Sequence, residues 1–348
     1  MSVTQRPPPD LDGESRTGVD GSRSSARSGV LRTIFWNTRQ QRARAVWLAL
    51  LPVVGAYAAL IAGEVVATEI GLPVQVGFAL FSFAALVTVV ALMGVSSRYL
   101  GARRIPDYGL AVDRRWRVDF AAGLVVGFVA VSIPFLFALA LGWVEIGAVF
   151  DAGELALLPG FVAVGAGLLC VGVWEELAIR GVLLGNTADG LRRWLSPHRA
   201  IAVAVALSGL VFGLAHIAQP DYAPLILTWV FAGLVFGGMY VFSGSLALPI
   251  GAHITVNAAY QMVFVRTDYA GTESYSAVMR IVPDPALAFL QAGGVIDIGV
   301  YGTLGLLTYL WLRFSRGKIT IDPVALQLAA SEPRARRRTD DAVHRSRQ

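Results

Sequence analysis

Long apolar stretches dominate this chain, and they limit the folds that it can adopt. A helix that crosses a hydrocarbon core of about 30 Å needs roughly 20 mostly apolar residues. Eight stretches meet this requirement, at residues 45–68, 73–95, 119–144, 157–184, 200–217, 224–243, 245–265 and 286–313. The sequence therefore predicts an all-α, polytopic membrane bundle of about eight transmembrane helices with a polar site inside it.

Composition supports a membrane protein over a soluble domain. Of the 348 residues, 55% are hydrophobic and only 15% are charged, whereas ordinary soluble domains are about a quarter charged. The single cysteine, Cys170, excludes a disulfide within the chain. The net charge of +5 comes mainly from arginines in the tails and connections. A membrane orientation signal explains these arginines more simply than a nucleic-acid partner does.

Polar tails flank the apolar region. Residues 1–44 are rich in Arg, Ser, Gly, Pro and Asp, which predicts a disordered basic tail, and residues 315–348 form a second basic tail. The transmembrane bundle is expected over residues 45–314. Because arginines concentrate in alternate connections, both termini are expected in the cytoplasm. High arginine with a single lysine, Lys318, favours a bacterial cell membrane.

Charged and imidazole side chains within the apolar stretches are the candidates for function, because a charge at membrane depth costs about 2.5–3.5 kcal/mol. The polar residues of this kind are Glu64, Glu175, Glu176, Arg180, His216, His253, Asn257 and Asp297. Glu176 and Arg180 are four residues apart and therefore share a helix face. Glu175 is turned by about 100° from Glu176. We expect one carboxylate to pair with Arg180 and the other to serve as a general base.

Three short motifs contain most of these residues. They are W-E-E-L-A-I-R at 174–180, F-G-L-A-H at 212–216 and H-I-T-V-N at 253–257. In this order they resemble the motifs E-E-x-x-x-R, F-x-x-x-H and H-x-x-x-N or D of the CPBP family, over about residues 150–265. That family comprises CAAX prenyl proteases of the Rce1 type, bacteriocin-processing enzymes and abortive-infection (Abi) membrane proteins. The resemblance implies an intramembrane endopeptidase that hydrolyses a peptide bond of a membrane-associated or lipid-modified protein or peptide.

The resemblance also implies a role for each motif residue. Glu175 would activate a water molecule with help from His216, while His253 and Asn257 would stabilise the oxyanion of the tetrahedral intermediate. The expected catalytic set is Glu175, Glu176, Arg180, His216, His253 and Asn257.

A metal mechanism is an open alternative. Glu175, His216 and His253 match the ligand types of a catalytic zinc site with one free position, as in a metalloprotease. The sequence contains no H-E-x-x-H, and the three ligands would come from three helices. We favour the metal-independent glutamate mechanism, and the cofactor stays unassigned.

The connection between the fourth and fifth stretches sets a geometric condition. His216 lies about 15 residues, or roughly 22 Å, along the fifth stretch from its cytoplasmic start. Glu175 can reach this depth only if the fourth helix continues to about residue 184 or beyond. The sequence therefore predicts a long, tilted fourth helix.

Two other functions use the same residues. A secondary transporter or proton-coupled carrier would use the carboxylates of Glu64, Glu175, Glu176 and Asp297 as a relay. A non-catalytic membrane scaffold of the same family is the other alternative. The His–Asn pair together with E-E-x-x-x-R favours hydrolysis, because transport does not require it. The expected partners are the lipid bilayer and a membrane-embedded or lipidated peptide.

Overall fold

The computed structural model describes residues 32–217, 226–268, 274–290 and 293–328. Its long helices are α2 (Ala45–Glu69), α3 (Val74–Tyr99), α4 (Arg114–Ala140), α5 (Leu157–Glu175), α7 (Pro197–Ala215), α8 (Ile226–Ser243), α9 (Ala247–Ala258) and α10 (Val295–Arg316). Shorter helical segments are η1 (Ile105–Tyr108), η2 (Glu176–Leu184), α6 (Gly185–Leu191), η4 (Ala259–Val263), η5 (Ala288–Leu290) and α11 (Pro323–Leu328). The strands are β1 (Trp36–Asn37), β2 (Arg42–Ala43), β3 (Val144–Asp151), β4 (Phe264–Arg266) and β5 (Ala277–Pro283).

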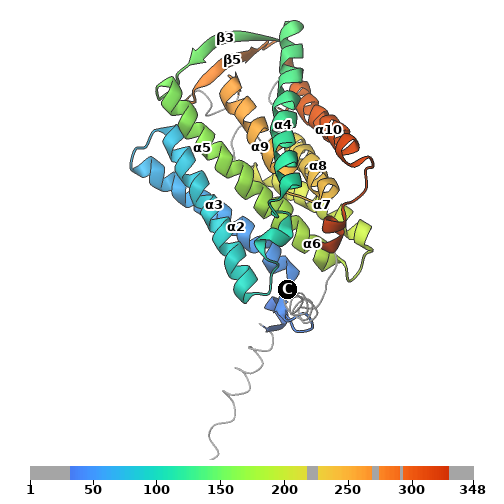
Figure 1. Ribbon diagram of the computed structural model, residues 1–348. Helices are drawn as coiled ribbons and strands as arrows, with labels where there is room; N and C mark the ends of the chain where they lie inside the picture. Colours follow the sequence, from blue (N-terminus) through green and yellow to red (C-terminus); the bar gives the residue numbers. More distant parts are fainter. Residues whose placement is uncertain (1–31, 218–225, 269–273, 291–292, 329–348) are drawn as a thin grey trace, which may run out of the picture.

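The molecule is an all-α membrane bundle, as predicted. Seven of the described helices are long and apolar enough to cross a membrane: α2, α3, α4, the continuous helix α5–η2–α6, α7, α8 and α10. The helix in the predicted seventh stretch, 245–265, is shorter than these seven helices. It consists of α9, with 12 residues, and the five-residue η4 that follows it. The helices lie side by side with the small sheet at one end and α11 at the other (Figure 1).

Helix α9 still passes from one end of the bundle to the other, in the same direction as α4. Near their starts, the Leu246 N–H donates to the Gly109 carbonyl at 3.1 Å. At their other ends the two helices lead into β3 and β4, which both pair with β5. Since α9 completes an eighth passage, the start of α2 and the end of α10 lie at the same end of the bundle.

The fourth helix is longer than the apolar stretch predicted at 157–184. It runs for 35 residues from Leu157 to Leu191 and crosses the bundle obliquely (Figure 1). Its centre is the π-helical segment η2, a wide helical form that occurs frequently at functional sites. Glu175 therefore lies near the middle of the helix, about 24 Å from Leu191. His216 lies about 28 Å from the start of α7, somewhat farther than the roughly 22 Å expected, because α7 begins already at Pro197.

Close backbone packing joins α4 to α9. A Cβ atom at Gly251 would come within 2.3 Å of the Phe120 carbonyl oxygen, and one at Gly127 within 2.4 Å of the Ala252 carbonyl oxygen. Small residues at these contacts let two membrane helices approach closely. This packing fixes the position of α9, which carries His253 and Asn257.

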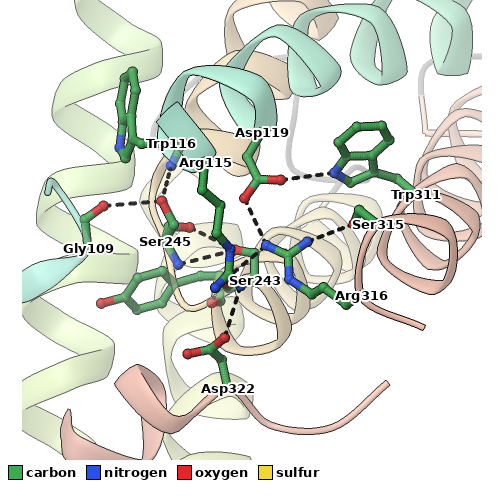
Figure 2. A network of polar contacts seen from close by, with 12 residues as sticks. Gly109, Arg115, Trp116, Asp119, Ser243, Ser245, Trp311, Ser315, Arg316 and Asp322 are labelled. Atoms are coloured by element: carbon green, nitrogen blue, oxygen red, sulfur yellow. Dashed lines mark hydrogen bonds and ion pairs between the residues drawn. The ribbon is translucent and has the colours of Figure 1, made fainter. Parts of the chain in front are cut away.

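A polar network surrounds the turn between α8 and α9 (Figure 2). Arg115 and Arg316 each donate to the carbonyl of Ser243, the last residue of α8, at 3.3 Å. Cations at a helix C-terminus are favourable because the carbonyl groups there carry partial negative charge. Arg316 also pairs with Asp119 at 2.8 Å, and Arg115 pairs with Asp322 at 3.2 Å. The network therefore connects α4, α10 and the segment before α11 to the start of α9.

A three-stranded sheet covers the end of the bundle away from α11, and the sequence pattern did not predict it. Its order is β3-β5-β4, with β3 antiparallel and β4 parallel to β5. Strand β3 includes Val144, which was expected to end the third membrane stretch. The predicted stretch 286–313 likewise begins as a helix only at Val295, after Gly293 and Gly294.

Parts of both predicted tails pack against the bundle. In the N-terminal part, β1 pairs with β2, and Arg42 of β2 forms an ion pair with the buried Asp189 of α6. In the C-terminal part, the Asp322 side chain caps α11 by accepting from the N–H of Val324 at 2.9 Å. Ala325 of α11 is buried. Residues 1–31 and 329–348, where most of the predicted tails fall, lie outside the described residues.

Candidate functional site

Four of the six predicted catalytic residues meet in the middle of the bundle. Glu175 ends α5, Glu176 and Arg180 belong to η2, and His253 lies on α9. All four are buried, and Glu176 and Arg180 are 0% exposed. Charged side chains are almost never buried to this extent unless they are paired. The pairing within this group is therefore the central feature of the site.

One oxygen of Glu176 joins the other groups. Its Oε1 atom accepts a hydrogen bond from Nη1 of Arg180 at 2.8 Å and one from Nδ1 of His253 at 2.7 Å. The first contact has the four-residue spacing that the sequence predicted. The second connects two helices and fixes the orientation of the imidazole ring, so that Nε2 points away from Glu176.

The carboxylate of Glu175 has a different environment from that of Glu176. Its Oε2 atom lies 3.8 Å from Nε2 of His253, which is too long for a hydrogen bond. Its side chain is 11% exposed, whereas that of Glu176 is 0% exposed. The two adjacent carboxylates therefore have different contacts: Glu176 bonds both Arg180 and His253, and Glu175 faces the Nε2 side of His253.

Aromatic rings enclose the Arg180 guanidinium. Its Cζ atom lies 4.4 Å from the centre of the Phe212 ring and 5.2 Å from that of Phe236. Aromatic faces attract cations, especially where water is excluded. Phe236 also lies 5.0 Å from the His253 ring, centre to centre. Phe236 was not identified from the sequence, because a phenylalanine in an apolar helix carries no functional signal.

Phe212 lies between His216 and this cluster. The ring centres of His216 and His253 lie 4.8 Å and 6.2 Å from that of Phe212. Nδ1 of His216 is 2.7 Å from the Phe212 carbonyl oxygen. Since a carbonyl can only accept, Nδ1 carries a proton and Nε2 is the basic nitrogen of the neutral ring. The ring also stacks on Trp229 at 4.6 Å, a contact that the sequence did not predict.

Asn257 lies one turn beyond His253 on α9 and is partly buried. Among the described residues, its amide makes no hydrogen bond with the four-residue cluster. The structure therefore places Asn257 on the same helix as His253 but does not join it to the other motif residues.

Several buried polar atoms around the cluster form no hydrogen bond within the described part of the chain. They are Oε2 of Glu176, Nε and Nη2 of Arg180, and Nε1 of Trp174. Leaving a buried donor or acceptor unsatisfied costs about 1–3 kcal/mol. These atoms are therefore suited to contact a polar ligand such as water or a peptide group.

The zinc alternative needs Glu175, His216 and His253 to lie around one point. Across the described ranges, no three His, Cys, Asp or Glu side chains are grouped closely enough to hold a metal ion. Nδ1 of His253 is bonded to Glu176 and Nδ1 of His216 to a backbone carbonyl, which leaves Nε2 of each ring as the nitrogen that could bind a metal. Among the described residues, Glu175, His216 and His253 do not form such a group.

The other two intramembrane carboxylates lie apart from the site. Glu64 is exposed on the surface of α2. Asp297 of α10 accepts hydrogen bonds from the Tyr260 hydroxyl at 2.6 Å and from the Gly293 N–H at 2.7 Å. The Asp297 carboxylate therefore bonds to groups that belong to the fold. Neither Glu64 nor Asp297 extends the buried cluster into a chain of carboxylates.

Comparison with known proteins supports the predicted resemblance. Residues 157–259 match the Rce1-like family, described as type II CAAX prenyl endopeptidase Rce1-like. The matched region contains all three motifs, and the match supports an assignment to the CPBP/Rce1 type. Comparison with curated proteins and with solved structures gives no match.

Proposed function

From this match to the Rce1-like family, we propose that the chain is an intramembrane endopeptidase of the glutamate type. The observation that carries the proposal is the buried cluster in which Glu176 binds both Arg180 and His253 while Glu175 stays outside these hydrogen bonds. The proposed substrate is a membrane-embedded or lipid-modified peptide. The proposed orientation has both termini in the cytoplasm.

Glu175 is the proposed general base. Its carboxylate is buried in the membrane, faces His253 and makes no hydrogen bond shorter than 3.5 Å to a described residue. A carboxylate in this setting can take a proton from a water molecule as the water adds to the peptide carbonyl carbon. The proton then passes to the leaving nitrogen as the C–N bond breaks, so that no proton is gained or lost overall.

His253 is the proposed donor to the oxyanion. Because Nδ1 is bonded to Glu176, only Nε2 can donate, and the ring must carry both protons to do so. Asn257, one turn along α9, supplies an amide N–H on the same helix as a second donor.

His216 is the proposed partner of Glu175 in proton transfer. Its Nδ1–H is held by the Phe212 carbonyl and its ring is stacked on Trp229, so the basic Nε2 has a fixed direction. Such orientation of an imidazole by a hydrogen bond to the other nitrogen is how proteins fix a catalytic histidine. Glu176 and Arg180 act as positioning residues for His253.

The proposal is tested by cleavage of a panel of membrane-tethered peptides with the purified protein in lipid. Glu175→Gln and His253→Ala should each lower cleavage by about 10²-fold or more, the usual contribution of such groups. Glu64→Gln is the matched control, because it removes an intramembrane carboxylate outside the cluster and should leave cleavage unchanged. A chelator should also leave cleavage unchanged.

The alternatives give different results in the same assay. Equal cleavage by wild type, Glu175→Gln and His253→Ala would overturn the catalytic assignment. Loss of cleavage in Glu64→Gln as well as in Glu175→Gln would favour a carboxylate relay over the local cluster. A non-catalytic scaffold would cut no peptide of the panel in any variant.

A further inference from the structure

Strand β3 is the least covered element of the sheet. It pairs with β5 along one edge only, and its other edge is free in the described structure. Six of its eight residues are exposed, whereas β4 is buried throughout. Between Ile146 and Phe150 the strand carries no charge. Neither face of this segment is therefore packed against the bundle.

Apart from Glu145 near its start, the exposed side chains of β3 are apolar. Ile146 is 47% exposed, Val149 is 59% exposed and Phe150 is 66% exposed. We call these three residues the β3 surface. Phe150 has a φ of 52°, a left-handed conformation that is rare for a bulky residue. Free sheet edges are usually protected from water and from other strands by charged residues or proline, and the interior of β3 has neither.

The β3 surface is continuous with the lipid-facing surface of the bundle. Leu141, directly after α4, and Leu158, in the first turn of α5, are both exposed. Since α4 and α5 are membrane-spanning helices, β3 joins two lipid-exposed helix ends. Figure 1 shows β3 running crosswise to these helices along the end of the bundle, as an element in the plane of the membrane surface would.

We propose that β3 is a membrane-surface anchor whose apolar side chains lie in the headgroup layer of the leaflet opposite α11. The hydrocarbon core could not hold this strand, because the free backbone N–H and C=O groups would lack partners there. Bulk water would leave three large apolar side chains exposed on an unprotected edge. The headgroup layer provides both apolar contact and hydrogen-bonding groups. This proposal does not depend on the catalytic assignment.

Spin labels attached to single cysteines test the depth of the β3 surface. Cys170→Ser removes the only native cysteine, and cysteine is then introduced separately at each of the three positions. The full-length protein in phosphatidylcholine nanodiscs is probed with oxygen, which concentrates in lipid, and with a water-soluble nickel chelate. Val112→Cys, in the exposed connection before α4, is the aqueous reference. Val125→Cys, exposed in the middle of α4, is the hydrocarbon reference.

The expected result is an oxygen-to-nickel collision ratio several-fold above that of the Val112→Cys label and below that of the Val125→Cys label, at all three positions. A ratio equal to the aqueous reference would overturn the proposal. So would protection from both reagents, which would indicate that another polypeptide covers the strand. Agreement of three independent positions guards against one variant that disturbs the fold.

Discussion

Nδ1 of His253 lies 2.7 Å from Oε1 of Glu176, although the two residues are 77 positions apart in the chain. The same oxygen accepts from Arg180 at 2.8 Å. A single carboxylate oxygen therefore joins the motif on η2 to the motif on α9. Any change that moves this oxygen affects both the packing of two membrane helices and the direction of the imidazole ring.

Removal of the guanidinium should destabilise the fold strongly. Arg180→Met leaves the fully buried Glu176 without its cation, and breaking a buried pair in this way costs about 3–5 kcal/mol. Adding Glu176→Gln should recover part of this loss, because the uncompensated charge is then gone. A double-mutant cycle from denaturant unfolding in detergent measures the coupling. Arg117→Met, at an exposed position, should change the free energy of unfolding by less than about 0.5 kcal/mol. Strictly additive losses would contradict the pairing.

His216 should act through Nε2. His216→Asn keeps a donor near the position of Nδ1 for the Phe212 carbonyl but has no group at Nε2. Cleavage should fall by about 10²–10⁴-fold while the unfolding temperature stays close to that of wild type. Nitrogen-15 NMR of the neutral ring should show the proton on Nδ1. Full activity of His216→Asn would remove this residue from the mechanism.

The contact between α4 and α9 should not tolerate a methyl group. Gly251→Ala places a Cβ atom within 2.3 Å of the Phe120 carbonyl oxygen, so the helices must separate at a cost of about 1–3 kcal/mol. Gly302→Ala in α10 is the matched control, because a Cβ atom there has no neighbour within 4 Å. It should be neutral or stabilising by up to about 1 kcal/mol. Equal effects of the two substitutions on unfolding would contradict the close packing.

The sheet should loosen in acid. A hydrogen bond from Arg280 holds the pKa of Asp151 below its ordinary value. A carboxyl whose pKa is lowered by folding stabilises the folded form above its unfolded pKa, near 4, and loses this effect as the pH falls through the folded value. Hydrogen exchange of β3 and β5 should therefore accelerate on acidification below about pH 4, after correction for the intrinsic rate. In Asp151→Asn this acid-dependent increase should be absent. An unchanged increase would assign it to other groups.

The sequence predicted the parts of the site that depend on local spacing. Glu176 and Arg180 pair because they are four residues apart on one helix, and apolar periodicity was enough to identify the long helices. The depth of His216 required the fourth helix to be long, and it extends to Leu191. These features follow from helix geometry alone, so no tertiary information was needed.

The features that the sequence missed depend on distant partners. Strand β3 pairs with β5, more than one hundred residues later, and its exposed residues lack the alternation of a half-buried strand. The stacking of His216 on Trp229 and the contact of Phe236 with His253 arise from helix packing. Nothing in a single apolar helix indicates which of its aromatic rings faces a charged group.

The arrangement of the site depends on how many residues the π-helical segment η2 contains, and not only on which residues they are. A π turn contains more residues than an α turn, so it sets the rotation between the two halves of the long helix. The first half directs Glu175 and Glu176 toward α9, and the second directs Asp189 toward Arg42. Loss of one residue between these halves would turn one set of side chains by about 100° relative to the other. A single-residue deletion in η2 would therefore disrupt this enzyme candidate even if every motif residue were kept.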